Sequence, residues 1–342
     1  MLKMRRISAY CFFLCLIMSG CSGQHSGSSE IDIHSIIGSV ASVEGASATT
    51  RPGRGEYVCA GVAIPDVVSQ WVYSEPHVAK ELALISNETS ALTIVGAMPP
   101  LNAARFENVR ALTWQIDVPV DDEQNPFSEC QEKVSRMLPE LARFPRLKYL
   151  QLEFPSAGDY SMFATSLCRL PQMSELEHLE IKGGSLLVMG LDAEAVAMKK
   201  LKSLIVRGWA DWQPCPDDVG LAIVVTSFYW LKGVPLEKLD MEGALLLELD
   251  SLRHLSQLKK LTPPIYYRLK DVARSVERLD MSVSELPLDG LERLSLLPDL
   301  KELVIQKEDE RPVRRILSGR QVDIIIKEED QCRPRNLRQS DI

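Results

Sequence analysis

The stretch that decides the fold is Leu147-Lys-Tyr-Leu150-Gln-Leu152. In an extended strand, alternate side chains point to opposite faces, so Leu150 and Leu152 share one face while Tyr149 and Gln151 share the other. The same phrase of apolar residue, two variable residues, leucine, one variable residue and apolar residue recurs along the chain. Its copies begin at Val109, Leu147, Leu176, Leu201, Leu236, Val276 and Leu300, with a degraded copy at Leu258.

The central leucines of successive copies are 18 to 38 residues apart, and most of the intervals contain a helix-like segment. The first such segment begins with a capping box at Ser128 and Gln131. We expect helices at Ser128–Phe144, Asp192–Met198, Asp217–Leu231, Leu269–Ser275 and Asp289–Leu297. Strands that alternate with helices predict a parallel sheet with its helices on one side, stacked as a solenoid. An ordinary α/β domain is the alternative, and the recurrence of the phrase favours the solenoid.

The phrase resembles the leucine-rich repeat, whose period is about 20 to 29 residues. The resemblance implies an α/β fold in which an irregular horseshoe has a parallel sheet on its concave face and helices on its convex side. Residues 109–326 would form this domain and 56–108 its N-terminal cap, with an early strand at Ala91–Ile94. A last strand is expected at Val322–Ile326, before a charged C-terminal tail at 327–342.

The chain departs from the leucine-rich repeat at the ninth position of the phrase, where the family usually has asparagine. The asparagine side chain satisfies backbone groups of the loop, so its absence predicts an irregular curvature. The residues at this position are Asp117, Pro155, Gly184, Trp209, Ala244, Ser284 and Glu308.

The residues between the inward leucines are predicted to face the concave side, where we expect a partner to bind. Because Lys238 and Arg278 stand beside Asp240 and Asp280, cross-strand pairing would cancel most of their charge. This favours a protein or peptide partner over a highly charged ligand; the alternative is a solvated face without a partner. The predicted partner-binding residues are Tyr149, Gln151, His178, Glu180, Lys182, Arg207, Lys238, Asp240, Arg278 and Asp280.

Residues 1–20 have the features of an export signal. Lys3, Arg5 and Arg6 precede an uncharged apolar run from Ile7 to Met18. This run is shorter than the roughly 20 residues that span a bilayer as a helix, and it suits a secretory signal.

The run ends in Met18-Ser-Gly-Cys21, which resembles the lipobox of bacterial lipoproteins although Leu is more common than Met at its first position. The resemblance implies cleavage before Cys21 and a diacylglycerol on its sulfur. The alternative is an ordinary cleaved signal peptide.

A lipid on Cys21 would hold the mature chain on a membrane, because two or more acyl chains anchor stably. Residues 21–55 are rich in Gly and Ser near their start and predict a flexible tether with a reach of about 30 Å. The resemblance also implies an extracytoplasmic location. With Ser22 after the cysteine, it favours the outer membrane of a Gram-negative cell.

The net charge of −8 becomes −11 once residues 1–20, which hold three basic residues and no acidic one, are removed. So acidic a chain is not expected to bind nucleic acid through its general field. Besides Cys21 the mature chain has an odd number of cysteines, so bridging of the others would leave one thiol unpaired, and their connectivity stays open. These are Cys59, Cys130, Cys168, Cys215 and Cys332.

The sequence carries no recognised catalytic motif. Its five histidines, His25, His34, His77, His178 and His254, lack metal-ligand spacing, and no cofactor or metal is predicted. A second candidate contact is the loop Trp209-Ala-Asp-Trp212-Gln-Pro-Cys-Pro216, although packing against the sheet is the more usual fate of tryptophan. Three hypotheses follow: a tethered protein-binding scaffold, a structural envelope lipoprotein without a ligand, and, least supported, an enzyme with an unrecognised site.

Overall fold

The residues that the computed structural model describes belong to Ala46–Arg333, one of the two units into which the chain divides. The described residues are 50–51, 57–59, 62–64, 70–74, 89–96, 106–116, 136–154, 163–166, 173–183, 186–189, 198–207, 223–225, 227–284 and 286–327. Cys21, the segment between Trp209 and Pro216 and the tail after Lys327 lie outside these residues. Of the cysteines, only Cys59 is within them.

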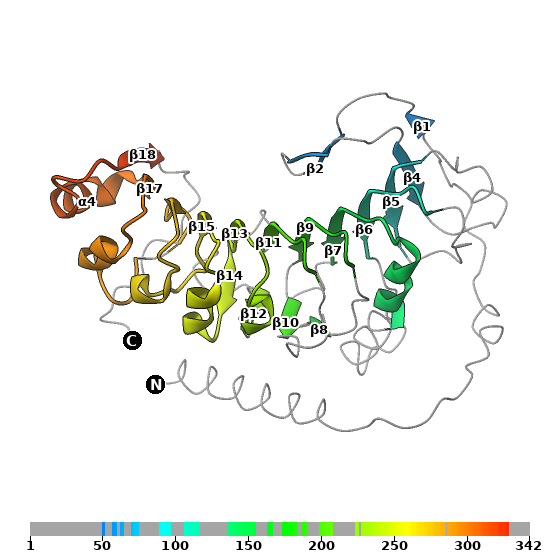
Figure 1. Cartoon of the computed structure of the whole chain (residues 1–342), viewed down its shortest axis with the longest axis horizontal. Coiled ribbons are helices and arrows are strands. Elements are labelled where there is room, and N and C mark those ends of the chain that lie inside the picture. Colours follow the sequence, from blue (N-terminus) through cyan, green and yellow to red (C-terminus); the bar gives the residue numbers. More distant parts are fainter. Residues whose placement is uncertain are drawn as a thin grey trace, which may run out of the picture. The chain divides into compact units, whose positions relative to one another are not determined.

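A 12-stranded sheet, here called the main sheet, organises the unit (Figure 1). Its first strand is antiparallel to its neighbour, and all later neighbours pair in parallel. The strands, in their order across the sheet, are β1 (Thr50–Arg51), β4 (Gln70–Ser74), β5 (Ala91–Val95), β6 (Ala111–Gln115), β7 (Tyr149–Glu153), β9 (His178–Lys182), β11 (Ser203–Arg207), β13 (Lys238–Asp240), β15 (Lys260–Thr262), β16 (Arg278–Asp280), β17 (Glu302–Gln306) and β18 (Asp323–Lys327). The predicted parallel sheet is confirmed, and the architecture is that of a solenoid-like α/β fold.

The recurring phrase lies in register from strand to strand. Leu112 is the register partner of Leu150, which is in turn the partner of Leu179. The central leucines of all eight copies are at most 2% exposed and form one buried row. A short turn precedes each strand; for example, the N–H of Leu147 donates to the carbonyl of Phe144 at 3.2 Å. The leucines therefore position every strand of this row by burial.

The sheet crosses the boundary that the sequence predicted between residues 108 and 109. β5 pairs with β6 over five residues, from Ala91 opposite Ala111 to Val95 opposite Gln115, and β4 pairs with β5. The segment before Val109 is therefore part of the same sheet, and not only a cap on its end. The early strand predicted at Ala91–Ile94 is β5, which carries Leu92 and Ile94 of the phrase but has Thr89 in place of its first apolar residue.

A second parallel sheet was not predicted. It has four strands: β8 (Phe163–Ser166), β10 (Leu186–Met189), β12 (Ile223–Val225) and β14 (Ala244–Leu246). In the best-described link, a turn at Met241–Ala244 joins β13 to β14, and Gly243 supplies its positive φ of 72°. Ile223 and Leu246 belong to the same buried core as the leucines of the main sheet. A separate antiparallel pair comprises β2 (Tyr57–Cys59) and β3 (Val62–Ile64).

The expected helices are short where the structure describes them, and those predicted at 269–275 and 289–297 are 3-10 helices of three and six residues. A 3-10 helix rises about 2.0 Å per residue against 1.5 Å for an α-helix, so it suits connections this brief. The 3-10 helices are η3 (Leu138–Arg143), η5 (Tyr229–Leu231), η6 (Leu249–His254), η7 (Leu269–Asp271), η8 (Leu291–Leu296) and η9 (Lys307–Asp309). An α-helix, α4 (Glu310–Ile316), precedes β18.

Candidate functional site

One side of the main sheet carries the variable residues of the phrase, and we call it the polar face. Its third-position column runs from Tyr149 through His178 and Ser203 to Lys238 by direct register pairing. The fifth-position column likewise joins Gln151 to Glu180. Because side chains alternate along a strand, the third, fifth and seventh positions point the same way. All ten predicted partner-binding residues therefore lie on this face.

Three of those residues are buried where β7 meets β9. The phenol of Tyr149 donates a 2.6 Å hydrogen bond to Oε2 of Glu180, and Oε1 of Gln151 lies 3.1 Å from the same phenol oxygen. Nζ of Lys182, partly exposed, lies 3.0 Å from Oε1 of Glu180. Glu180 is 0% exposed and Gln151 9%, so these side chains hold neighbouring strands together. Their prediction as contact residues for a partner is corrected here.

His178 is half-buried beside this cluster. Burial lowers its pKa from the ordinary value of 6.5, and the positive charges of Lys202 and Lys238 act in the same direction, against the opposing effect of Glu177. Its Nδ1 has no hydrogen-bond partner in the part of the chain that the structure describes. Burial and the two lysines therefore favour the neutral imidazole.

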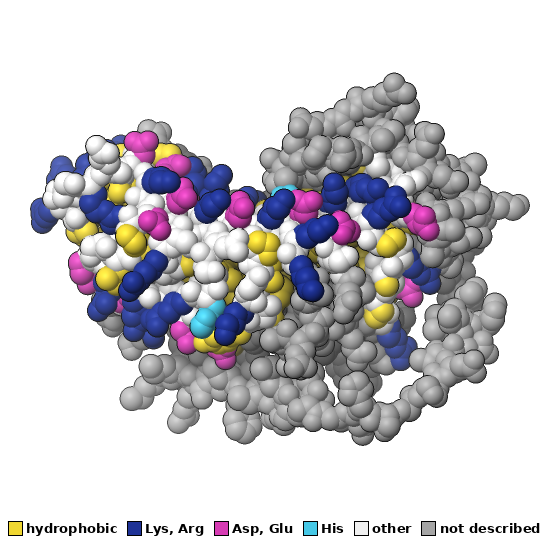
Figure 2. All heavy atoms as spheres, viewed as in Figure 1, with side chains coloured by type: hydrophobic (Ala, Val, Ile, Leu, Met, Phe, Trp, Pro, Cys, Tyr) yellow, Lys and Arg dark blue, Asp and Glu magenta, His cyan; other side chains and the backbone are white. Residues whose placement is uncertain are grey.

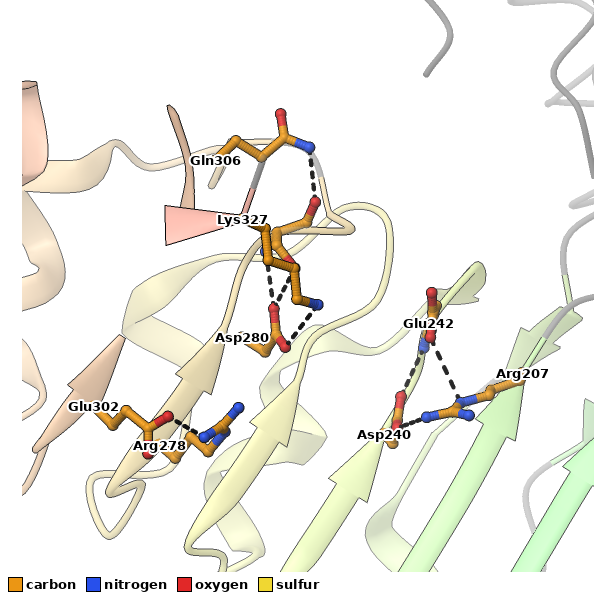
Figure 3. Close-up of polar contacts among 9 residues, drawn as sticks. Arg207, Asp240, Glu242, Arg278, Asp280, Glu302, Gln306 and Lys327 are labelled. Carbon is orange, nitrogen blue, oxygen red and sulfur yellow. Dashed lines mark hydrogen bonds and ion pairs between the residues drawn. The ribbon is translucent and has the colours of Figure 1, made fainter. Parts of the chain in front are cut away.

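Arg207, at the end of β11, bridges to the turn that follows β13. Its guanidinium donates to Oδ2 of Asp240, and its Nε lies 3.6 Å from Oε2 of Glu242 (Figure 3). Burial lowers the pKa of Arg207, but the hydrogen bond and the charges of these carboxylates outweigh it, so the net shift is upward. Asp240 is 4% exposed, so its carboxylate serves the fold and does not face a partner.

Asp240 and Asp280, each at the end of its strand, accept hydrogen bonds from the turn that follows. Oδ1 of Asp240 accepts the N–H of Glu242 at 3.3 Å. Oδ1 of Asp280 accepts the N–H of Ser282 at 3.1 Å and its hydroxyl at 2.5 Å. Each carboxylate satisfies turn donors, as the missing asparagine would in a leucine-rich repeat.

The expected charge pairing is also corrected. Oδ2 of Asp240 accepts from Arg207, and Oδ2 of Asp280 lies 3.3 Å from Nζ of Lys327. Arg278 pairs with Glu302 on the next strand (Figure 3). Asp240 and Asp280 therefore pair with Arg207 and Lys327, and neither pairs with Lys238. The partners come from other strands, Arg207 from β11, Glu302 from β17 and Lys327 from β18, and the phrase alone does not give these distances.

Immediately before the strands, the second position of the phrase alternates in sign. Lys202 is 2.7 Å from Glu177, Lys259 is 3.8 Å from Glu237, and Lys301 is 2.8 Å from Glu277. The hydrogen bond from Lys202 lowers the pKa of Glu177, and the one from Lys301 lowers that of Glu277. Figure 2 shows basic and acidic side chains interspersed on the visible face. From Lys148 to Lys301 neighbouring rungs of this column join opposite charges, whereas Arg110 and Lys148, on its first two rungs, are both basic.

The third column has a run of three basic residues on neighbouring rungs. Lys238 is the register partner of Lys260, and Lys260 is the partner of Arg278, so three cations occupy successive rungs. Directly opposed like charges destabilise a sheet. Among the described residues, no carboxylate lies within ion-pair distance of Lys238 or Lys260. The basic hollow, as we name it, has a volume of about 270 Å³ here; its lining is Lys238, Leu239, Asp240, Lys260, Leu261, Thr262, Arg278 and Asp280.

Lys260 is the residue that the sequence prediction left out of the partner-binding set. It is exposed, and it lies at the centre of the basic hollow. The signal was present in the degraded copy Leu258-Lys-Lys-Leu261, in which the third position is again basic. Aligning that copy with its neighbours places Lys260 between Lys238 and Arg278.

The described residues contain no group of three or more His, Cys, Asp or Glu side chains placed to hold a metal ion. Within the same residues, no helix has the length and apolarity needed to cross a membrane. Comparison with known proteins adds no assignment: no family model matches the sequence, and no curated protein does either.

Proposed function

We propose that this chain is an exported lipoprotein, tethered by a lipid on Cys21, whose leucine-rich-repeat-like domain binds a protein partner at the basic hollow. The single observation that carries the binding proposal is the row of Lys238, Lys260 and Arg278 on successive rungs. The partner would bind through carboxylate groups, which form charge-assisted hydrogen bonds with lysine and arginine.

The contrast between two adjacent columns supports this proposal. From Lys148 to Lys301 the second column alternates charges, as expected of residues that serve stability alone. The third column places like charges opposite one another, which weakens the sheet unless an anion neutralises them. Sites whose charge arrangement opposes stability are commonly retained for function.

The spacing suits an extended acidic peptide. Neighbouring strands are about 4.8 Å apart, so Lys238 and Arg278 are about 10 Å apart across two rungs. An extended peptide advances about 3.3 Å per residue and its alternate side chains share a side, so carboxylates two or four residues apart span about 7 or 13 Å and bracket this distance.

Photocrosslinking in the native cell tests the binding proposal. A photoreactive phenylalanine at Thr262, in the lining of the basic hollow, should capture a partner. The double variant Lys238→Glu, Lys260→Glu should lose that capture. Lys199→Glu, an exposed site outside the polar face, makes the same kind of charge change and should retain it. If the double variant captures as much as the parent chain, the hollow is not the binding site.

The tether needs a separate test. A Cys21→Ala chain should lose acyl labelling and membrane retention while its domain still folds. Membrane association that survives high-salt and carbonate washing in this variant would contradict the lipid proposal. Absence of any partner, with Cys21 still acylated, would favour the structural envelope lipoprotein. Turnover of an envelope substrate by the purified chain would favour an enzyme.

A further inference from the structure

The main sheet ends at β18, and that strand is unusually open. It pairs in parallel with β17 over five residues, and in the described part of the chain no strand pairs with its other edge. Ile325 is 42% exposed, whereas its register partner Val304 on β17 is 1% exposed. An edge strand presents unpaired N–H and C=O groups, and an apolar one readily accepts another strand.

The charges at the two ends of β18 are incompletely matched within the chain. Asp323 is the register partner of Glu302, which places two acidic residues on neighbouring rungs. No cation of the described residues lies within ion-pair distance of Asp323. At the other end, Lys327 is about half exposed and lies 3.3 Å from Asp280. An incoming strand would therefore gain by placing a cation beside Asp323 and an anion beside Lys327.

We propose that the edge of β18 binds the same edge of a second copy of this chain, in antiparallel register centred on Ile325. The sequence Asp323-Ile-Ile-Ile-Lys327 is complementary to itself in this arrangement. Asp323 stands opposite Lys327 of the second copy, and the symmetry axis repeats that pair at the other end. Ile325 faces its own counterpart, and Ile324 faces Ile326 of the second copy.

The charges select this arrangement over the alternative. An in-register parallel pairing would place Asp323 beside Asp323 and Lys327 beside Lys327, which is unfavourable. The antiparallel pairing also joins the two main sheets into one, with both polar faces on the same side. Ile324, which already packs against the core, would then continue the apolar layer into the second copy.

Cysteine crosslinking of the full chain in cell membranes tests the register. Because Ile325 meets its counterpart directly, Ile325→Cys should give a disulfide-linked dimer on mild oxidation, seen on a non-reducing gel. Asp323→Cys should not, since the two sites are four residues out of register, while Asp323→Cys combined with Lys327→Cys should. The parent chain gives the background from its own cysteines. Equal crosslinking at 323 and 325 would overturn the proposal. Crosslinking at 325 that does not exceed the background would overturn it too, and is the result expected if residues after Lys327 cover the strand.

A charge swap tests the complementarity independently. Asp323→Lys alone or Lys327→Asp alone should raise the dissociation constant of the dimer by about tenfold, because each turns two attractive pairs into repulsive ones. The double swap should restore it. Sedimentation equilibrium of the purified full chain in detergent measures the constant. A double variant no better than the single ones would contradict the antiparallel pairing. The outcome is separable from binding at the basic hollow, because it is measured on the purified chain without a partner, and the Asp323→Lys arm changes no residue of the hollow's lining.

Discussion

Lys238 and Lys260 are direct register partners on β13 and β15, two cations on neighbouring rungs of a parallel sheet. One position earlier, Lys259 lies between Glu237 and Glu277, with its amine 3.8 Å from Glu237. Adjacent lysines of one strand segment are thus placed in opposite electrostatic environments. The same substitution at the two positions should have opposite effects on stability.

We predict that Lys260→Glu stabilises the fold, since it replaces a repulsion on each side by an attraction. Lys259→Glu should destabilise it, because three acidic residues would then occupy successive rungs. Each change in the free energy of unfolding should be about 0.5 to 1 kcal/mol. Denaturant titration at low salt measures both, and about 1 M salt should shrink the difference. If Lys260→Glu destabilises as much as Lys259→Glu, the like-charge rung does not oppose stability and the binding proposal loses its support.

The Tyr149–Glu180 hydrogen bond should contribute more than any exposed pair on the polar face. Tyr149→Phe removes the donor and leaves a fully buried carboxylate with less compensation. We expect a loss of about 1 to 3 kcal/mol in the free energy of unfolding. Glu180→Gln keeps the shape without the charge and should lose less. Thermal denaturation of both variants checks this order, which would reverse if Lys182 were the main partner of the carboxylate.

Folding stability should fall on mild acidification because of His178. Its pKa in the folded chain is below the ordinary 6.5, so between those two values the unfolded chain binds more protons. The stability present above pH 6.5 is therefore lost as the pH falls through 6.5 toward the folded-state pKa. His178→Gln should flatten the difference in denaturation midpoint between pH 7.5 and pH 5.5. A variant with an unchanged pH dependence would assign the effect to other groups.

Asp280 allows its two roles to be separated. Asp280→Asn keeps an oxygen that can accept the N–H of Ser282 but removes the charge facing Lys327. Asp280→Ala removes both. We expect Asp280→Ala to lower the free energy of unfolding by about 1 kcal/mol, as loss of a capping side chain does elsewhere, and Asp280→Asn to lower it much less. Equal losses would mean that the ion pair with Lys327, and not the turn, needs the carboxylate.

The phrase predicted the main sheet because burial of its leucines is a periodic, local signal. Leu150, Leu179 and Leu204 are all at most 1% exposed, and their strands pair in register. The phrase could not predict which neighbouring side chains its variable residues contact. Arg207 pairs with Asp240 across 33 residues, because β13 follows β11 in the sheet after a long intervening segment. The polarity of a residue did not predict its exposure either, since Glu180 and Lys260 are both charged but Glu180 is buried and Lys260 is exposed.

The second sheet was missed for a different physical reason. Short apolar runs such as Ile223-Val-Val225 have no periodicity that separates a buried strand from the end of a buried helix. The sequence placed this run inside an expected helix at Asp217–Leu231. In the structure it is β12, and Ile223 and Val225 are buried in the shared core.

The energetic weight of that second sheet can be measured. Ile223 is 0% exposed, so Ile223→Ala should leave a cavity in the shared core and lower the free energy of unfolding by about 2 to 4 kcal/mol. Leu247, one residue beyond β14, is 47% exposed, and Leu247→Ala should change the free energy of unfolding by less than about 0.5 kcal/mol. Both variants remove apolar groups near the same sheet, so their comparison isolates burial from composition. Urea denaturation followed by circular dichroism gives the two values. Equal and small losses would show that β12 does not pack on the main sheet, and the solenoid-like core would then rest on the leucine row alone.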